Sequence, residues 1–496
     1  MNHMRGYFIT LLLVIIFSNI TYCLAEEQSI ELSLQDCIDR ALKENLNLKS
    51  SYLGLRAEDF SIIQAESQFD PFLSLSMNRR QSETPTYLDY YNVKSIESKI
   101  SQLDLTLSQT LSTGANWGFG FYNTLSESNI ETAKNYSSNL GISVSQPLLK
   151  GFGKKINRSN IFIARLTKES TLYDLENNAI TLVNEVQKAY WNLAYALESL
   201  KVRELSIDQA DSLLAYNRKG LELGVLTESD VLEAESTLLS RQQDVLFQKG
   251  QIRAAEDVLI RLLNLISGEG WRLKIVPTDI ASVTDIDIDP EDAFRNAVKL
   301  RPEYKIILKN LEQYDIYQAL AKNNMSPSLD LTARYNINGS GKNYSKDLRD
   351  MGGFDQYGWN LGLLFSYPLK NRNAKADYEK RQIDIKRANL ALEDIESMFM
   401  AEIRTGIRNV EISREMINVA KLSVEVNELR LKKEEERFRN QLSTSYFVLQ
   451  FQTDLVDSRN RYNKTIIDYI IAVAELRKAR GTLLRDFDIS IIPIVN

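Results

Sequence analysis

The sequence predicts a mostly helical protein with a membrane β-barrel portion, in which one order of elements occurs twice. Three observations support this prediction: two long tracts with helical periodicity, several short segments of apolar/polar alternation, and a repeat at a constant offset. Of the 496 residues, 44% are hydrophobic and 25% are charged, so the composition is neither disordered nor collagen-like.

Two tracts have the spacing of helices that pack side by side over a long distance. Residues 156–223 contain no proline, and their apolar residues recur at steps of three and four, as in coiled coils. Residues 374–439 keep a seven-residue spacing apart from one four-residue jump, a stutter. Each tract would reach roughly 100 Å as a helix at 1.5 Å per residue. A further helix is expected after each tract, over 228–266 and 445–485, which would complete two long hairpins.

Two strand regions, 71–148 and 328–369, interrupt the helices. Segments such as Phe72–Met77, Trp117–Phe121 and Leu329–Ala333 alternate between apolar and polar or small residues, as expected of a strand with one face in lipid or in a core. The first region has room for four strands and the second for two. The sequence leaves open whether the extra hairpin joins the barrel. The polar segments 81–97 and 337–357 are expected to be surface loops.

The chain is interpreted as a duplication. A shift of 256 positions aligns Asp36 with Asp292 and Pro71 with Pro327 without gaps. The predicted repeats cover 26–268 and 290–485, with a linker at 269–289 and a tail at 486–496. Each repeat begins with a shorter helix, at 34–67 and 290–324. The same order of elements is not easily obtained twice by chance.

The N-terminus has the pattern of an export signal. Arg5 precedes an apolar run from Tyr7 to Phe17, and small and polar residues follow. We expect residues 1–25 to be a signal peptide that is cleaved after Ala25, with lipid attachment at Cys23 as the alternative. After residue 26 no stretch approaches ~18 consecutive apolar residues, so no transmembrane helix is expected.

Scarce residue types exclude most catalytic chemistry. The single histidine is His3, and the two cysteines are Cys23 and Cys37. A mature chain without histidine has no Ser-His-Asp triad and no imidazole metal ligand, so no catalytic residue, metal or cofactor is predicted. A carboxylate-dependent exported enzyme is the remaining alternative, but the acidic residues fall mostly on helical surfaces. The formal charge of −6 is spread along the chain and argues against a nucleic-acid partner.

The strands are too few to close a membrane barrel within one chain. Four or six strands would leave open edges, and unpaired backbone groups are not tolerated in lipid. Several chains would therefore contribute strands to one barrel and arrange their long helices into a tube with a water-filled bore. The alternative reading is a periplasmic coiled-coil adaptor or scaffold protein without a membrane barrel.

Five segments resemble a known family. They are LSLQDCIDRALKENLNLKSS (32–51), SQPLLKGFG (145–153), GVLTESDVLEAESTLL (224–239), LRPEYK (300–305) and QLSTSYFVLQFQTDL (441–455). With them, the sequence resembles the TolC-like outer-membrane efflux proteins over nearly the whole mature chain. The resemblance implies a homotrimer in the outer membrane, with a 12-stranded β-barrel among the lipids and an α-barrel tunnel in the periplasm. It also implies docking to a periplasmic adaptor and an inner-membrane transporter, for efflux or type I secretion.

The same resemblance suggests functional residues at the two hairpin tips. The positions presented to the adaptor are Gly224, Leu226, Thr227, Leu442 and Ser443. At the periplasmic aperture, Asp230 matches an acidic residue of the family and Glu233 follows one turn later. In the second tip the acidic positions become Phe447 and Gln450, or Tyr446 if the alignment shifts by one. We therefore hypothesise an entrance closed partly by aromatic packing; the alternative is that these aromatics only pack between helices.

Two clusters of charged residues each have a functional interpretation and a simpler structural one. The basic corner of Lys150, Lys154, Lys155 and Arg158 is either a contact for anionic lipid head groups or a solvated helix start. Residues 434–436 are three consecutive glutamates, and we expect them to form an exposed charge run rather than a docking site.

Overall fold

The computed structural model describes residues 29–85, 94–130, 134–265, 273–284, 286 and 288–490. The predicted signal peptide and Cys23 lie outside the described residues, as do parts of the predicted linker and tail. The chain forms two compact units. The first, here called the hairpin unit, comprises the described parts of 1–47, 179–293 and 402–496, and the second, the sheet unit, comprises 48–178 and 294–401.

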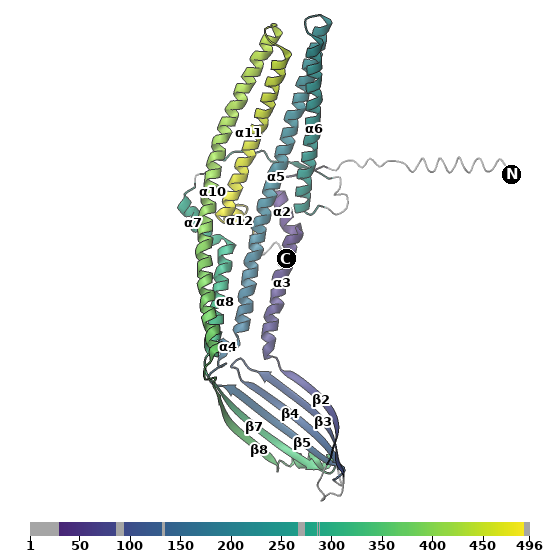
Figure 1. Ribbon diagram of the computed structural model, residues 1–496, viewed down its shortest axis with the longest axis vertical. Helices are drawn as coiled ribbons and strands as arrows, with labels where there is room; N and C mark the ends of the chain where they lie inside the picture. The colour runs from purple at the N-terminus through teal and green to yellow at the C-terminus, as the bar shows by residue number, and fades with distance from the viewer. Residues whose placement is uncertain are drawn as a thin grey trace, which may run out of the picture. The chain divides into compact units, whose positions relative to one another are not determined.

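The sheet unit contains a six-stranded antiparallel sheet in the order β2-β3-β4-β5-β7-β8 (Figure 1). The strands are β2 (Phe72–Pro85), β3 (Ser95–Thr110), β4 (Asn116–Ser128), β5 (Asn135–Pro147), β7 (Ser328–Gly341) and β8 (Tyr357–Ser366). The strands from the two halves of the chain meet where β5 pairs with β7.

The two faces of this sheet differ in character. One hydrogen-bonded row crosses all six strands through Leu75, Leu105, Phe121, Leu140, Ile337 and Tyr357. An adjacent row, whose side chains point to the other face, consists of Ser74, Thr106, Gly120, Gly141, Asn336 and Gly358. Because side chains alternate along a strand, one face is apolar and the other is polar or small.

The extra hairpin of the first repeat, β3–β4, lies inside the sheet. Its turn is fixed by a hydrogen bond from the Leu111 N–H to the Ala115 carbonyl (2.7 Å), and Gly114 has a positive φ of 93°. A Cβ at Gly114 would lie 2.5 Å from the Gly151 carbonyl oxygen, so only glycine fits where this turn meets the segment that follows β5. Within the described residues this sheet therefore has six strands, whereas a 12-stranded trimer requires four from each chain.

The predicted surface loops are partly regular structure. Strand β2 continues to Pro85, β3 begins at Ser95, β7 continues to Gly341, and the helix α9 (Tyr344–Gly352) follows it. The loop prediction is therefore wrong over these residues. Polar side chains do not prevent backbone pairing, and the strand ladders extend beyond the apolar part of the sheet.

Four helical segments continue from the sheet within the same unit. They belong to α3 (Leu46–Glu66), α5 (Ser159–Glu222), α8 (Pro302–Asn324) and α10 (Arg372–Arg439), and the short α4 (Lys154–Asn157) and η1 (Ser67–Phe69) stand at the junction. Side-chain bonds connect them in the order α3-α5-α8-α10: Lys168 to Asp59 (2.5 Å), Gln313 to Thr167 (3.1 Å) and Tyr304 to Glu396 (2.9 Å).

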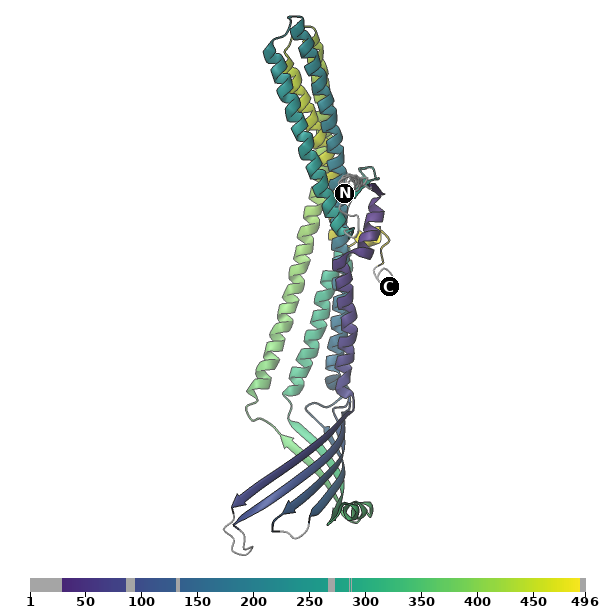
Figure 2. The same ribbon diagram turned by 90° about the vertical axis from the view of Figure 1, so that its right-hand side faces the viewer.

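The hairpin unit is built from two long antiparallel helix pairs. The remaining part of α5 is followed by α6 (Glu228–Leu262), and that of α10 by α11 (Ser445–Ala479) (Figures 1 and 2). Near the tips, Leu214, Ala234, Phe438 and Val448 form a shared buried cluster. These residues come from all four helices, so the cluster joins the two pairs. Each fully buried large apolar side chain contributes about 1.5–3 kcal/mol to stability. Among the described residues, no helix combines the length and apolarity needed to cross a bilayer.

Smaller elements complete the hairpin unit. They are α2 (Leu34–Glu44), α7 (Pro290–Leu300), α12 (Leu483–Asp486) and the parallel pair β1 (Ser29–Leu32) and β6 (Lys274–Pro277). The Tyr190 hydroxyl donates to Asp279 (2.6 Å), which also accepts the Leu34 N–H (2.6 Å). These bonds attach the segment after β6 and the start of α2 to the long helix α5.

The two shorter helices that the sequence predicts as continuous are each broken. The predicted helix 34–67 divides at Asn45 into α2 and α3, and the predicted helix 290–324 divides at Arg301 into α7 and α8. Both residues have extended backbones, with ψ values of 125° and 130°. Pro302 explains the second break, since proline disfavours the helical conformation of the preceding residue. At the first, Asn45 donates to the Leu262 carbonyl (3.1 Å) and accepts the Asn47 N–H.

Candidate functional site: the hairpin tips

The first tip reverses the chain between α5 and α6. Gly224 has a positive φ of 71°, and the Val225 and Leu226 N–H groups both donate to the Gly220 carbonyl. A Cβ at Gly220 would lie 2.6 Å from Leu226 Cδ1, so the leucine packs over the glycine. Leu226 is half-buried against the apolar cluster, whereas Leu223 and Val225 are the exposed apolar residues of this tip.

Thr227 and Asp230 form a capping box at the start of α6. The Asp230 N–H donates to Thr227 Oγ1 (3.3 Å), and the Thr227 N–H (2.9 Å) and hydroxyl (2.6 Å) donate to Asp230 Oδ2. The hydrogen bond from the Thr227 side chain, followed by that from its backbone, holds the pKa of Asp230 below its ordinary value. The pattern of threonine and an acid three residues later is a recognisable helix-start signal in the sequence.

The second tip turns between α10 and α11 through Gln441, which has a positive φ of 59°. The Ser443 hydroxyl donates to Glu434, and Arg437 donates to the other oxygen of the same carboxylate (3.1 Å). Glu434 is buried, so the prediction that residues 434–436 form an exposed charge run is wrong for its first member. The carboxylate instead binds Ser443, nine residues later, and so holds the turn.

One hydrogen bond connects the two tips directly. The buried Ser445, at the start of α11, donates from its hydroxyl to Asp230 Oδ1 (3.2 Å). This bond also lowers the pKa of Asp230, after the two bonds from Thr227. The structure thus places Asp230 between the hairpins, with both carboxylate oxygens already accepting hydrogen bonds. Glu233, one turn later, is half-buried.

The aromatic residues of the second tip are exposed in the single chain. Tyr446 is 52% and Phe447 45% exposed, and their rings pack edge to face with centroids 5.5 Å apart. Gln450 lies one turn further on α11 and is also exposed, and Leu442 at the turn itself is 67% exposed. Within one chain the two aromatic side chains are about half-exposed and therefore accessible from outside.

The core below the tips contains a cation that the sequence does not reveal as buried. Arg241 of α6 is 7% exposed and donates from Nη1 to the Ser206 carbonyl (2.7 Å) and to Gln452 Oε1 (3.1 Å). Burial lowers its pKa. Because its partners lie on α5 and α11, Arg241 joins three helices through polar bonds, and no local motif marks it.

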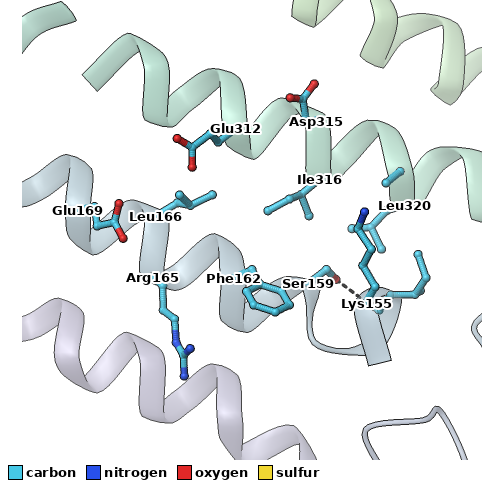
Figure 3. Close-up of a pocket in the computed structure, with 12 residues that line it drawn as sticks. Lys155, Ser159, Phe162, Arg165, Leu166, Glu169, Glu312, Asp315, Ile316 and Leu320 are labelled. Atoms are coloured by element: carbon cyan, nitrogen blue, oxygen red, sulfur yellow. Dashed lines mark hydrogen bonds between the residues drawn. The ribbon is translucent and has the colours of Figure 1, made fainter. Parts of the chain in front are cut away.

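A separate hollow of about 540 Å³ lies in the sheet unit between α5 and α8 (Figure 3). Leu166, Ile316 and Leu320 form its apolar wall. The carboxylates at its rim, Glu169 and Glu312, both bind Lys309 at 2.9 Å. The Glu169–Lys309 pair joins α5 to α8, whereas Lys309 and Glu312 both belong to α8.

The fold is that of known outer membrane channels. The CmeC outer membrane channel of Campylobacter jejuni matches 91% of this chain and 86% of its own length, with a TM-score of 0.69 and 16% sequence identity. At this level of identity the likeness establishes the fold alone.

Sequence comparison finds a family similarity in the first part of the chain. The outer membrane efflux protein family matches residues 37–265. This match covers slightly less than half of the chain, and over this segment the chain is similar to the outer membrane efflux proteins. The resemblance predicted from the five motifs is thereby confirmed over this segment, and the family's description agrees with the outer-membrane location predicted from the sequence.

Two individual proteins are similar to parts of this chain. Toxin and drug export protein A of Aggregatibacter actinomycetemcomitans is 23% identical over 244 residues, which are 48% of this chain and 52% of that protein. The alkaline protease secretion protein AprF of Pseudomonas aeruginosa is 28% identical over 109 residues, 22% of each chain. The chain spans about half the length of the first of these relatives and less of the second.

We expect Thr227→Ala to loosen the first turn of α6. Loss of an N-cap costs about 1 kcal/mol, or roughly fivefold in local opening, and hydrogen exchange of peptides covering residues 225–235 in the full-length protein in detergent measures it. The pKa of Asp230 is lowered from 3.8, so its stabilising bonds are present above that pH and are lost as the pH falls through the folded value. The effect of the substitution should therefore shrink in acid.

Thr444→Ala is the matched control. Thr444 occupies the same cap position before α11 but makes no side-chain capping bond, so its removal should leave exchange unchanged. Equal effects of the two substitutions would contradict the role assigned to the Thr227–Asp230 box.

Proposed function

We propose that this protein is one subunit of an outer-membrane channel whose helices continue the pore into the periplasm. The channel would give passive exit to substrates delivered by an inner-membrane transporter through a periplasmic adaptor, in efflux or in type I secretion. The observation that carries the proposal is the exposed apolar face of the six-stranded sheet.

That face suits lipid. Met77, Trp359 and Leu363 are 74%, 71% and 66% exposed, and they belong to an apolar surface that spans all six strands. A continuous exposed apolar surface across six strands is typical of a contact with another protein or with a membrane. The opposite face, with its polar and glycine rows, suits a water-filled bore.

The sheet edges support assembly from several copies. Within the described residues, β2 and β8 each pair with one neighbouring strand, so each has an open edge. Unpaired backbone groups in hydrocarbon cost several kcal/mol each, and closing the barrel removes them. Cyclic symmetry would pair β8 of one copy with β2 of the next.

A trimer, the state implied by the family resemblance, would close a wider barrel than expected. Three copies of a six-stranded sheet hold 18 strands in place of 12. Barrel diameter grows roughly in proportion to strand number, and barrels of 16–18 strands leave an aqueous channel. We infer that the β3–β4 hairpin widens the membrane pore.

The internal duplication is also part of this proposal. The helices α2 and α7 begin at Leu34 and Pro290, and the strands β2 and β7 begin at Phe72 and Ser328. Each pair differs by the 256 positions found in the sequence, and the breaks at Asn45 and Arg301 obey the same offset. This agreement supports two copies of one ancestral unit.

The tips are proposed as the partner-binding end. The exposed Leu442, together with Leu223 and Val225, offers apolar contact area to an adaptor, while Gly224, Leu226, Thr227 and Ser443 shape the turns. At the aperture we propose that Tyr446, Phe447 and Gln450 of adjacent copies approach one another. Asp230 and Glu233 would supply the nearby charge.

Substitutions on the two faces of β8 test the channel assembly. Leu361→Arg places a charge on the lipid face, at a cost of up to about 2–4 kcal/mol, and should sharply reduce the protein in the outer-membrane fraction. The neighbouring Asn360→Arg points into the bore, so it should assemble normally and shift the ion selectivity in planar bilayers. Recovery of the wild-type protein as a soluble monomer would refute the proposal and favour a periplasmic scaffold.

Single-channel conductance tests the aromatic closure. We expect Phe447→Ala to raise conductance severalfold, because it removes a bulky group from the constriction, and Asp230→Asn with Glu233→Gln to change it less. Gln450→Ala, which removes a smaller polar group at the same aperture, should change conductance less than Phe447→Ala does. An unchanged Phe447→Ala channel together with an opened Asp230/Glu233 variant would show that charge, not aromatic packing, closes the entrance.

Partner capture tests the docking tips. Leu442→Glu should lower the yield of envelope proteins cross-linked to the channel in cells by at least about tenfold, since a buried unpaired charge destabilises an apolar contact. Leu429→Glu, at another exposed leucine on α10 away from the turn, should leave the yield unchanged. Identical yields from both variants would place the adaptor contact elsewhere.

A further inference from the structure

The helix α9 is seated on the apolar face of the sheet, at the end opposite the long helices of the same unit (Figure 2). It packs over β7 and β5, where Gly339 and Gly341 follow Ile337 on the apolar side of β7. A Cβ at Gly339 would lie 2.2 Å from the Asp347 carbonyl oxygen, and one at Gly341 would lie 2.7 Å from the Asp347 nitrogen. The two glycines therefore make room for this helix.

A buried carboxylate fixes α9 in this position. Asp347 is 0% exposed and accepts hydrogen bonds from the backbone N–H (3.0 Å) and the hydroxyl (2.5 Å) of Ser138 on β5. Ser138 in turn accepts from Asn123 Nδ2 on β4 (2.6 Å). Since Asn343 also caps the helix through the Lys346 N–H (2.9 Å), α9 is a rigid part of the sheet unit.

The helix begins where the apolar band ends. On β7 the apolar positions run from Leu329 to Ile337, a stretch of nine residues that matches the 9–11 residues of a membrane-spanning strand. The next row on this face is polar or small beneath and beside the helix, with Asn123, Ser138 and Gly339, and it becomes apolar again at Leu103 and Met77 on β3 and β2. The row beyond it extends from Gly341 through Tyr136 to the exposed Arg79 on β2.

The outer side of α9 is cationic. Asp347 and Met351, four residues apart, face the sheet, so Lys346 and Arg349 lie on the opposite side, and both are exposed. Lys342 precedes the helix and is exposed as well, while Asp350 is half-buried. Tyr344, the first residue of α9, packs against Tyr136 of β5 with ring centroids 6.1 Å apart, and such aromatic residues are typical of a membrane interface.

We propose that Lys346 and Arg349, assisted by Lys342, bind the phosphate groups of anionic lipids in the outer leaflet of the membrane. The proposal rests on the channel function above, which places the apolar face in lipid. Cations on a lipid-facing helix must lie outside the hydrocarbon, and phosphates are the complementary charges at that level. The rigid attachment of α9 holds the guanidinium and the ammonium group at a fixed depth, where they can contact one head group together.

Lipid retention by the purified full-length protein tests this site. The probes are mixed micelles of a neutral detergent with diphosphorylated lipid A, and with phosphatidylcholine as the zwitterionic comparison, read by native mass spectrometry. We expect Lys346→Gln/Arg349→Gln to weaken diphosphoryl lipid A binding on the order of 10-fold, an effect that added salt reduces. Lys421→Gln/Lys432→Gln, two exposed cations of α10, should bind it as the wild type does.

Conductance measured on the same preparations distinguishes a failure of the lipid-site proposal from a failure of the proposed channel function. Channels of normal conductance with unchanged lipid A binding in the α9 variant would overturn the lipid site alone. Equal wild-type binding of lipid A and phosphatidylcholine would overturn it as well. If the wild-type protein forms no channel, the proposed function fails, and the membrane placement on which the lipid site rests fails with it.

Discussion

The main constraint on this protein is that backbone N–H and C=O groups cannot be left unpaired in hydrocarbon. One chain forms a sheet that is paired internally but open at β2 and at β8. The exposed apolar face makes a single chain unstable in water, and the open strand edges make a single chain unstable in lipid. Both problems have the same solution, which is the joining of copies edge to edge. In this proposal the pore is a consequence of satisfying the backbone.

The hairpin unit faces a different requirement, since its helices are long and have little interior of their own. Their stability comes from a shared apolar cluster and from polar bonds that cross between helices, such as those of Arg241 and of Asp230 with Ser445. Asp230 serves as helix cap and as the connection between hairpins. A residue with two structural bonds is less free to bind passing cations, which supports closure by the aromatic side chains of the second tip.

The sequence predicts the regular parts of this architecture because periodicity depends on which face of an element is apolar. The seven-residue spacing predicts a helix over 374–439, and α10 extends from Arg372 to Arg439. The features it does not predict depend on contacts distant in the chain. Asn45 ends a helix through a bond to the Leu262 carbonyl, and Glu434 is buried because Ser443 returns to it after the turn. The position of α9 is marked in the sequence by Gly339 and Gly341. Their role cannot be predicted, because it depends on the helix that packs against them.

The extra hairpin has a geometric consequence at the junction between strands and helices. Strands spaced about 4.8 Å apart and tilted by about 40° each occupy roughly 6 Å of a barrel's perimeter, so six of them cover about 37 Å. The four helical segments that continue from this sheet, at 8–10 Å between axes, cover about 32–40 Å. Six strands and four helices therefore subtend nearly the same arc. The pore wall can pass from one kind of backbone to the other without tapering.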